Sequence, residues 1–224
     1  MIFRKIKKRK LWLLLFVIII LFDILMQYAI TRNLSSNRVL KKTEQSEILK
    51  ELEFFPIPVS LDDESLSFSY VDTWNQSRTY GGDRHHEGTD IMTDLNEPGI
   101  YPVVSMSDGV VEKLGWLELG GYRVGIRTDS GLYLYYAHLQ SYMPDIKEGQ
   151  EIKAGECIGF IGDTGYGKEG TTGKFATHLH VGFYLPDKEG SDEALNPYPY
   201  LQKLTEKTLS YHYHNYDYNK EDTA

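Results

Sequence analysis

The sequence predicts a small, mostly β domain, built on a largely antiparallel sheet over residues 67–201. The chain has 224 residues, of which 41% are hydrophobic, which suffices for one domain with its own core and additional segments. It contains 20 Gly and 17 Tyr, residue types common in turns and in strands respectively. From about Ser67 onward, short strand-like runs alternate with glycine-containing turns, and few helical periods occur.

The N-terminal region has the pattern of a membrane anchor. Residues 1–10 carry six basic side chains and no acidic one, and residues 11–30 are apolar except for Asp23 and Gln27. As a helix at about 1.5 Å per residue, this run would span about 30 Å, the thickness of a bilayer core. We therefore predict a single-pass protein of the cell membrane, with residues 1–10 cytoplasmic and the β domain extracellular. The alternative is a cleaved signal peptide, but no A-x-A-like site follows the run.

Two segments flank the predicted domain. Residues 31–66 are polar and charged, with a weak apolar spacing that predicts one short helix, and Pro56 and Pro58 follow it. We interpret this segment as a linker. Residues 202–224 are polar and rich in tyrosine, and we interpret them as a solvated tail.

Within the domain, strand patterns follow one another closely. Residues 99–111 have a strand-turn-strand pattern. Residues 121–127 and 132–138 flank an Asp-Ser-Gly turn, which predicts a hairpin. Short strands are predicted at 158–161 and, last in the domain, at 177–184.

Charge and cysteine content exclude some classes of function. The net charge is −8, and because the first ten residues contribute +6, the rest of the chain carries −14. Such an acidic body argues against nucleic acid as a partner. Cys157 is the single cysteine, so an internal disulfide or a cysteine-based zinc site is excluded.

Histidines and an aspartate recur in patterns suited to metal binding. His178 and His180 lie two residues apart in the last predicted strand, so their side chains leave the same face of it. His86 and Asp90 form an H-x-x-x-D pair, and Gly88 between them permits a turn toward one ion. Catalytic zinc takes three protein ligands and keeps one position for water. This pair and either strand histidine would complete such a site, and the other histidine would remain for acid–base chemistry.

Each of these motifs is weak on its own. His212 and His214 repeat the H-x-H spacing in the polar tail, where we expect a solvated segment. His138 follows two tyrosines in a strand, a context typical of a core histidine. His85 offers a second register for the first ligand, but His86 gives the four-residue step to the aspartate and is favoured.

In combination, the motifs resemble those of a known family. Residues 86–90, 136–139 and 177–180 are similar, in order and approximate spacing, to the three signature blocks of the lysostaphin-like (LytM-type) zinc endopeptidases. The Val/Ile- and Gly-rich run at 146–165 also resembles that family, and the resemblance covers about residues 70–201. It implies a LytM-type antiparallel β domain that hydrolyses peptide bonds in bacterial peptidoglycan stems or cross-bridges through a metal-activated water. A membrane-anchored, outward-facing domain would lie beside that substrate.

The resemblance also implies a role for each polar residue. His86, Asp90 and His180 correspond to the ligands of one zinc ion per chain. His138 and His178 correspond to the two catalytic histidines, which act as general base and oxyanion stabiliser in an order that the motif leaves open. No protein partner is indicated.

Two departures and two alternatives accompany this interpretation. Residues 165–176 are longer and more charged than the usual link into the histidine strand, and we expect them to form a groove wall. Gly182 stands where the family often has Glu.

A catalytically inactive member that regulates another wall hydrolase would typically lack ligands, whereas all five positions are present here. A lipoyl- or biotinyl-carrier would need a Met-Lys-Met-like turn, which is absent.

Overall fold

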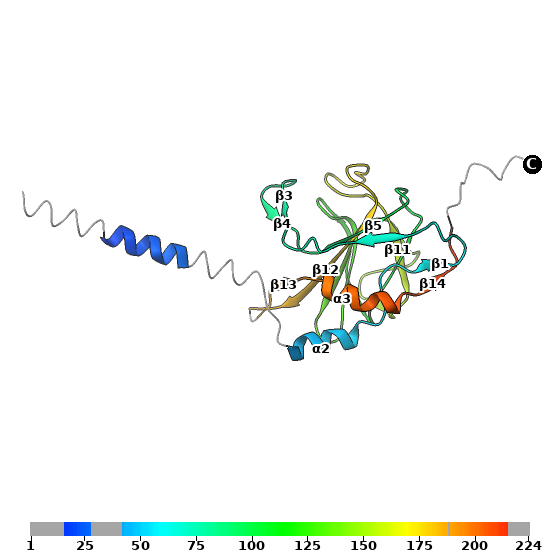
Figure 1. Cartoon of the computed structure of the whole chain (residues 1–224), viewed down its shortest axis with the longest axis horizontal. Coiled ribbons are helices and arrows are strands. Elements are labelled where there is room, and N and C mark those ends of the chain that lie inside the picture. The colour runs from blue at the N-terminus through cyan, green and yellow to red at the C-terminus, as the bar shows by residue number, and fades with distance from the viewer. Residues whose placement is uncertain (1–15, 28–41, 188, 215–224) are drawn as a thin grey trace, which may run out of the picture. The chain divides into compact units, whose positions relative to one another are not determined.

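The computed structural model describes residues 16–27, 42–187 and 189–214, and the chain divides into two compact units, Met1–Val39 and Leu40–Ala224 (Figure 1). The second unit is mostly antiparallel β, which confirms the predicted class of its fold. Its elements in chain order are α2 (Lys42–Glu51), β1 (Val59–Ser60), β2 (Phe68–Tyr70), β3 (Ser77–Arg78), β4 (Arg84–His85), β5 (Thr89–Thr93), β6 (Pro102–Val104), β7 (Gly109–Leu117), β8 (Gly121–Arg127), β9 (Tyr133–Tyr142), β10 (Glu151–Ile152), β11 (Cys157–Ile161), β12 (His178–Pro186), β13 (Asp192–Leu195), α3 (Tyr198–Leu204), the 3-10 turn η1 (Thr205–Lys207) and β14 (Ser210–Tyr211).

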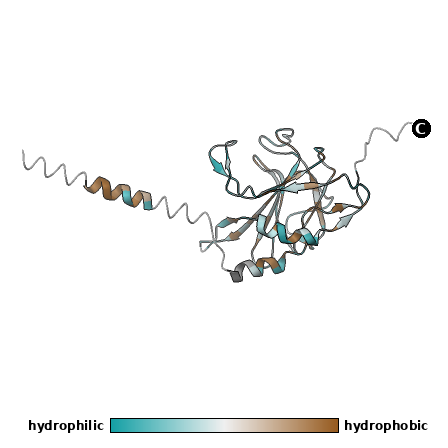
Figure 2. Ribbon diagram, viewed as in Figure 1, coloured by the Kyte–Doolittle hydropathy of each residue, from teal (hydrophilic) through white to brown (hydrophobic). Residues whose placement is uncertain are grey.

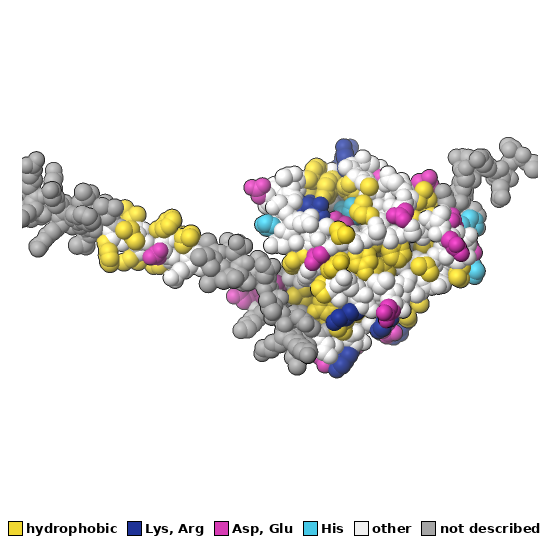
Figure 3. All heavy atoms as spheres, viewed as in Figure 1, with side chains coloured by type: hydrophobic (Ala, Val, Ile, Leu, Met, Phe, Trp, Pro, Cys, Tyr) yellow, Lys and Arg dark blue, Asp and Glu magenta, His cyan; other side chains and the backbone are white. Residues whose placement is uncertain are grey.

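The first unit contradicts the predicted membrane anchor. Its described part is a helix over residues 16–27 with exposed, largely hydrophobic side chains (Figures 2 and 3). Residues 1–15 and 28–30 lie outside the described residues. Because the described residues contain no helix with the length and apolarity to cross a membrane, the predicted transmembrane helix over 11–30 and the single-pass membrane location are corrected.

One large sheet organises the second unit. Ten of the described strands belong to it, and its main path runs β10-β7-β8-β9-β12-β5-β2. β11 pairs with β6 and β9, and β13 pairs with β12. All of these pairings are antiparallel. β12 therefore lies between β9 and β5, so a side chain on β12 has neighbours from two strands.

The sheet buries one face in the hydrophobic core. On β12, Leu179, Val181 and Phe183 alternate with His178, His180 and Gly182, and these three apolar side chains are fully buried. This period of two places the neighbouring histidines on the opposite face of the strand. The core thereby fixes which way the two histidines point.

The segment expected to be a linker supplies part of this core. α2 forms where the weak apolar spacing predicts a short helix, and Ile48 and Leu52 pack with Phe55 and Ile57 inside the main hydrophobic cluster. On the C-terminal side, Leu201 and Leu204 of α3 join the same cluster, and β14 pairs in parallel with β1. The two flanking segments thus meet each other and close over the sheet.

Leu52 provides a test of this packing. Its side chain is fully buried, so Leu52→Ala is expected to lower the free energy of unfolding by about 2–5 kcal/mol. The matched control is Leu61→Ala, because Leu61 is 56% exposed and its replacement should change stability by less than about 0.5 kcal/mol. Urea unfolding of the full chain measures both. Equal stability of the two variants would show that residues 48–57 lie outside the cooperative core.

Candidate functional site

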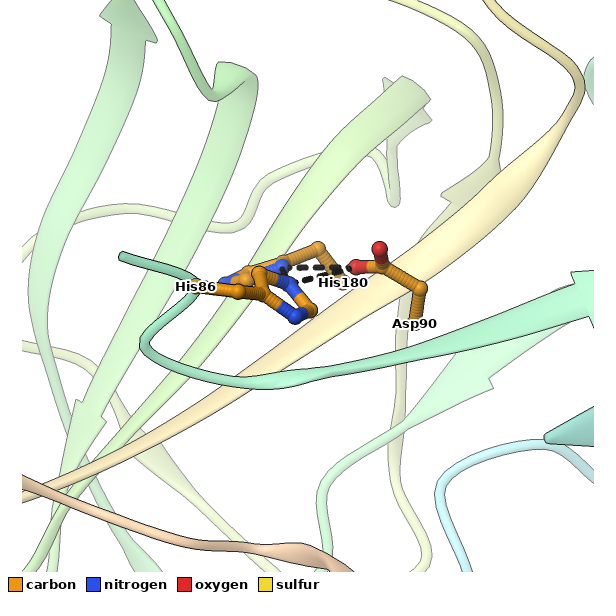
Figure 4. A group of neighbouring side chains, drawn as sticks. All are labelled: His86, Asp90 and His180. Carbon is orange, nitrogen blue, oxygen red and sulfur yellow. Dashed lines mark hydrogen bonds and ion pairs between the residues drawn. The ribbon is translucent and has the colours of Figure 1, made fainter. Parts of the chain in front are cut away.

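Three side chains from separate parts of the sequence converge on one point (Figure 4). His86 Nε2 lies 3.0 Å from Asp90 Oδ1 and 3.0 Å from His180 Nδ1, and His180 Nδ1 lies 2.9 Å from the same Asp90 oxygen. Among the described residues, these three form a group whose nitrogen and oxygen atoms lie close enough together to hold one metal ion. The sequence-predicted trio is therefore assembled by the fold.

The backbone explains this convergence. Asp90 on β5 lies directly opposite His180 on β12, so both side chains leave the same face of the paired strands. His86 follows β4, and its backbone N–H donates to the carbonyl of Gln76 at 2.9 Å. His85 is exposed, with Nδ1 3.0 Å from the carbonyl of Asn75. Of the two adjacent histidines, His86 is thus the one that joins the trio.

Gly88 is required for space in this arrangement. A Cβ atom on Gly88 would lie 2.4 Å from His180 Cε1 and 2.6 Å from the carbonyl oxygen of Val181, closer than real Cβ atoms approach. The φ angle of Gly88 is not in the left-handed region. The glycine between His86 and Asp90 therefore lets β12 approach closely, rather than making the turn that the sequence suggested.

The chemistry of the donors fits zinc. Two imidazole nitrogens and one carboxylate oxygen are a typical three-ligand set of catalytic zinc. In a tetrahedron with bonds of about 2.0 Å, ligand atoms lie about 3.3 Å apart, close to the 2.9–3.0 Å separations here. The carbonyl of Thr73 lies 3.1 Å from His86 Nδ1 and can accept its hydrogen, which leaves a lone pair on Nε2.

Electrostatics favour the metal-binding forms of Asp90 and His180. Burial raises the pKa of Asp90, but hydrogen bonds with His180 and His86 outweigh it and hold that pKa below its usual range. Burial lowers the pKa of His180, against an opposing hydrogen bond to Asp90. A deprotonated carboxylate and neutral imidazoles are the forms that ligate a metal.

His138 lies beside the trio at an irregularity in β9. Its φ is +65°, in the left-handed region, and the β8–β9 register shifts at the same place. On its other edge, β9 pairs with β12 as far as Ala137 and with β11 from Leu139 onward. His138 thus lies in a bulge where the strand changes partner, and bulges characteristically redirect a side chain.

Two histidine rings face each other next to the trio. The ring centroids of His138 and His178 are 4.7 Å apart, and His178 Nε2 lies 3.8 Å from Asp90 Oδ1. The Nδ1 atoms lie 2.8 and 2.7 Å from the carbonyls of Thr164 and Ala176 respectively. Because a carbonyl can only accept, these contacts place a hydrogen on Nδ1 of each ring, so that Nε2 carries the lone pair in the neutral form.

Burial sets the protonation of His138. Its side chain is buried, and burial, followed by the neighbouring His178 and His180, holds the pKa of His138 well below its ordinary value. The ring is therefore neutral at pH 7, with Nε2 available to accept a proton.

An aromatic cluster borders the two histidine rings, and sequence reasoning did not identify its members. Phe175 packs edge-on against His138 and His178, with centroids at 4.6 and 5.0 Å. Tyr166 contacts Phe175 at 4.8 Å and stacks on Tyr80 at 4.2 Å. The available signal was segment 165–176 itself, which was expected to form a wall and which supplies Tyr166 and Phe175.

The second H-x-H motif takes no part in the trio. His212 is exposed, and its Nδ1 lies 2.9 Å from Asp62 Oδ1, while His214 Nδ1 lies 3.8 Å from the other oxygen of the same carboxylate. Between them, Tyr213 donates a hydrogen bond to the carbonyl of Pro58 at 2.7 Å. This part of the expected tail is thus attached to the domain.

Comparison with known proteins gives a consistent result. An L-Ala–D-Glu endopeptidase of Bacillus subtilis is 43% identical over 148 residues, covering 66% of this chain and 42% of the relative. The peptidoglycan DD-endopeptidase ShyC of Vibrio cholerae is 32% identical over 122 residues, covering 54% of this chain and 25% of the relative. A Ruminococcus gnavus crystal structure, named for a glycyl-glycine endopeptidase LytM, superposes with a TM-score of 0.69 at 51% identity, covering 74% of this chain and 65% of that one.

The chain spans less than half the length of these two curated relatives. Residues 84–197, about half of the chain, match the model for peptidase family M23. The matched range contains the three convergent side chains and both neighbouring histidines. The resemblance inferred from the motifs is confirmed: the chain belongs to peptidase family M23.

Proposed function

We propose that this chain is a zinc endopeptidase that hydrolyses peptide bonds in the stems or cross-bridges of bacterial peptidoglycan. The observation that carries the proposal is the convergence of His86, Asp90 and His180 beside the facing rings of His138 and His178. The names of the relatives support the substrate class, since they include a peptidoglycan DD-endopeptidase and an L-Ala–D-Glu endopeptidase.

In this proposal, His86 Nε2, Asp90 Oδ1 and His180 Nδ1 hold one zinc ion per chain. Zinc, when bound, supplies the Lewis-acid chemistry that activates a water molecule and polarises a peptide carbonyl. The three ligands come from rigid strands or from a segment tied to them, so they orient the ion with little rearrangement.

His138 and His178 act on the proton and the charge that develop during hydrolysis. With Nδ1–H directed at a carbonyl, each ring presents Nε2 to the reaction. One ring takes the proton of the attacking water at a free Nε2 as general base. The other stabilises the negative charge on the carbonyl oxygen in the form whose Nε2 carries a hydrogen, because a lone pair there would repel that charge. Phe175 packs edge-on against both rings and supports their positions.

The relatives are named for three different bonds, L-Ala–D-Glu, D,D and glycyl-glycine, so the test must identify the bond as well as the activity. The zinc-loaded chain is incubated with isolated peptidoglycan sacculi of defined stem and bridge composition, and the released fragments are weighed by mass spectrometry. Cleavage that stops on chelation and returns with zinc is expected. Absence of fragments from every wall type, with zinc bound, would contradict the proposal and favour a catalytically inactive wall-binding protein.

A further inference from the structure

The two carboxylate oxygens of Asp90 have different neighbours. Oδ1 faces His86 and His180, at 3.0 and 2.9 Å. Oδ2 accepts a hydrogen bond from Arg78 Nη2 at 2.8 Å. Arg78 thus occupies the oxygen that the metal position does not use.

Arg78 belongs to a part of the chain that no motif pointed to. It lies on β3, in the β3–β4 hairpin, and it precedes the range matched by the family. The side chains of Arg78 and Asp90 are 31% and 17% exposed, so their ion pair is partly shielded from water. Shielding of this degree strengthens a charge-assisted hydrogen bond relative to one on the open surface.

Contacts to segment 165–176 hold the hairpin in place. Tyr80 stacks on Tyr166 with an interplanar angle of 6°, and its hydroxyl donates to the carbonyl of Tyr166 at 2.5 Å. Arg84 Nη2 donates to the Tyr166 hydroxyl at 3.0 Å. The position of Arg78 is therefore set by a packed hairpin and does not depend on Asp90 alone.

We propose that Arg78 is a positioning residue that holds Asp90 so that only Oδ1 is presented to the metal. This inference rests on the proposed zinc site. A carboxylate without such a partner can rotate and offer both oxygens, whereas the charge-assisted hydrogen bond from Arg78 to Oδ2 restrains that rotation. Partners of this kind behind a metal ligand typically change affinity or activity by about 10–100-fold when they are removed.

The positive charge of Arg78, considered alone, predicts the opposite effect on zinc affinity, which makes the inference testable. A guanidinium near a divalent cation repels it, so if repulsion dominated, replacing Arg78 would tighten zinc binding. The carboxylate of Asp90 lies between the guanidinium and the metal position, since each of its oxygens faces one of them. We therefore expect orientation to dominate and zinc affinity to fall.

The test measures zinc affinity by competition with a chelator for the full chain and three variants. Arg78→Gln is expected to bind zinc about 10–100-fold more weakly, and Arg78→Lys, which keeps the charge without the planar fork, should fall between it and the original protein. Arg84→Gln is the control for displacement of the hairpin, because it removes a guanidinium that contacts Tyr80 and Tyr166 but no proposed ligand, and its affinity should fall less than that of Arg78→Gln.

A spectroscopic measurement separates positioning from a general loss of structure. The visible absorption of the cobalt-substituted protein reports coordination number, so Arg78→Gln should alter it more than Arg84→Gln. At saturating zinc, Arg78→Gln should lower kcat with little change in KM. If Arg78→Gln fails to fold, Arg78→Lys carries the same affinity and absorption measurements.

Several outcomes would overturn the inference. Unchanged or tighter zinc binding by Arg78→Gln would show that the guanidinium does not position Asp90. A raised KM with unchanged zinc affinity would assign Arg78 to substrate binding instead. A zinc-loaded original protein that binds normally but cleaves no wall would contradict the proposed function while leaving the affinity comparison valid.

Discussion

Replacing His180 with alanine is expected to abolish zinc binding and peptidoglycan cleavage together. His180 supplies one of three ligand atoms that lie within 3.0 Å of each other, and two protein ligands rarely retain zinc against a chelator. The loss also leaves the partly buried Asp90 without one of the two histidine hydrogen bonds that lower its pKa. Elemental analysis should find close to no zinc per chain, and cleavage should fall to background.

The control for this variant is His212→Ala. His212 belongs to the other H-x-H motif, but it is exposed and pairs with Asp62 instead of with the trio. The His212→Ala variant should therefore retain about one zinc per chain and full activity. If His180→Ala kept its zinc, or if His212→Ala lost it, the ligand assignment would be wrong.

Replacing His138 or His178 with alanine should separate zinc binding from catalysis. Neither ring belongs to the convergent trio, so each variant should retain most of its zinc. Each should lower kcat by about 10²–10⁴, the usual range for loss of a general acid or base. Zinc content and turnover of the same preparations provide the measurement.

The double variant sharpens this expectation. Because the two rings lie 4.7 Å apart and are proposed to act on one reaction, their effects should combine to less than the product of the single losses. A fully multiplicative loss would indicate independent roles. Full activity of His138→Ala would remove that residue from the mechanism altogether.

Local spacing predicted which residues could gather at the site, and the family resemblance singled out His180 over His178 as the third member of the trio. His178 and His180 lie two residues apart, so they share one face of the strand that the sequence predicts. His86 and Asp90 lie only four residues apart, so they remain close to each other in the folded chain. The alternation of short strand-like runs with glycine-containing turns likewise predicted the antiparallel sheet. These features depend on short stretches of chain, where residue type and spacing carry most of the information.

Features that depend on long-range packing were not predictable in the same way. A weak apolar spacing at Ile48 and Leu52 suits either a short helix in a linker or a helix that completes a core, and only the tertiary contacts distinguish the two. Arg78 reaches Asp90 through a hairpin whose register is set by pairing and by the Tyr80–Tyr166 contact. Gly88 was visible in the sequence, but a glycine is needed there because β12, some 90 residues away, packs against it.

The left-handed backbone at His138 sets stability and activity against each other. A non-glycine residue in this region costs roughly 1–2 kcal/mol relative to ordinary conformations. Glycine adopts the same φ without that strain, so His138→Gly should be more stable than His138→Ala by about 1 kcal/mol while being equally inactive. A search for thermostable variants that does not also score cleavage would therefore tend to select inactive proteins at this position.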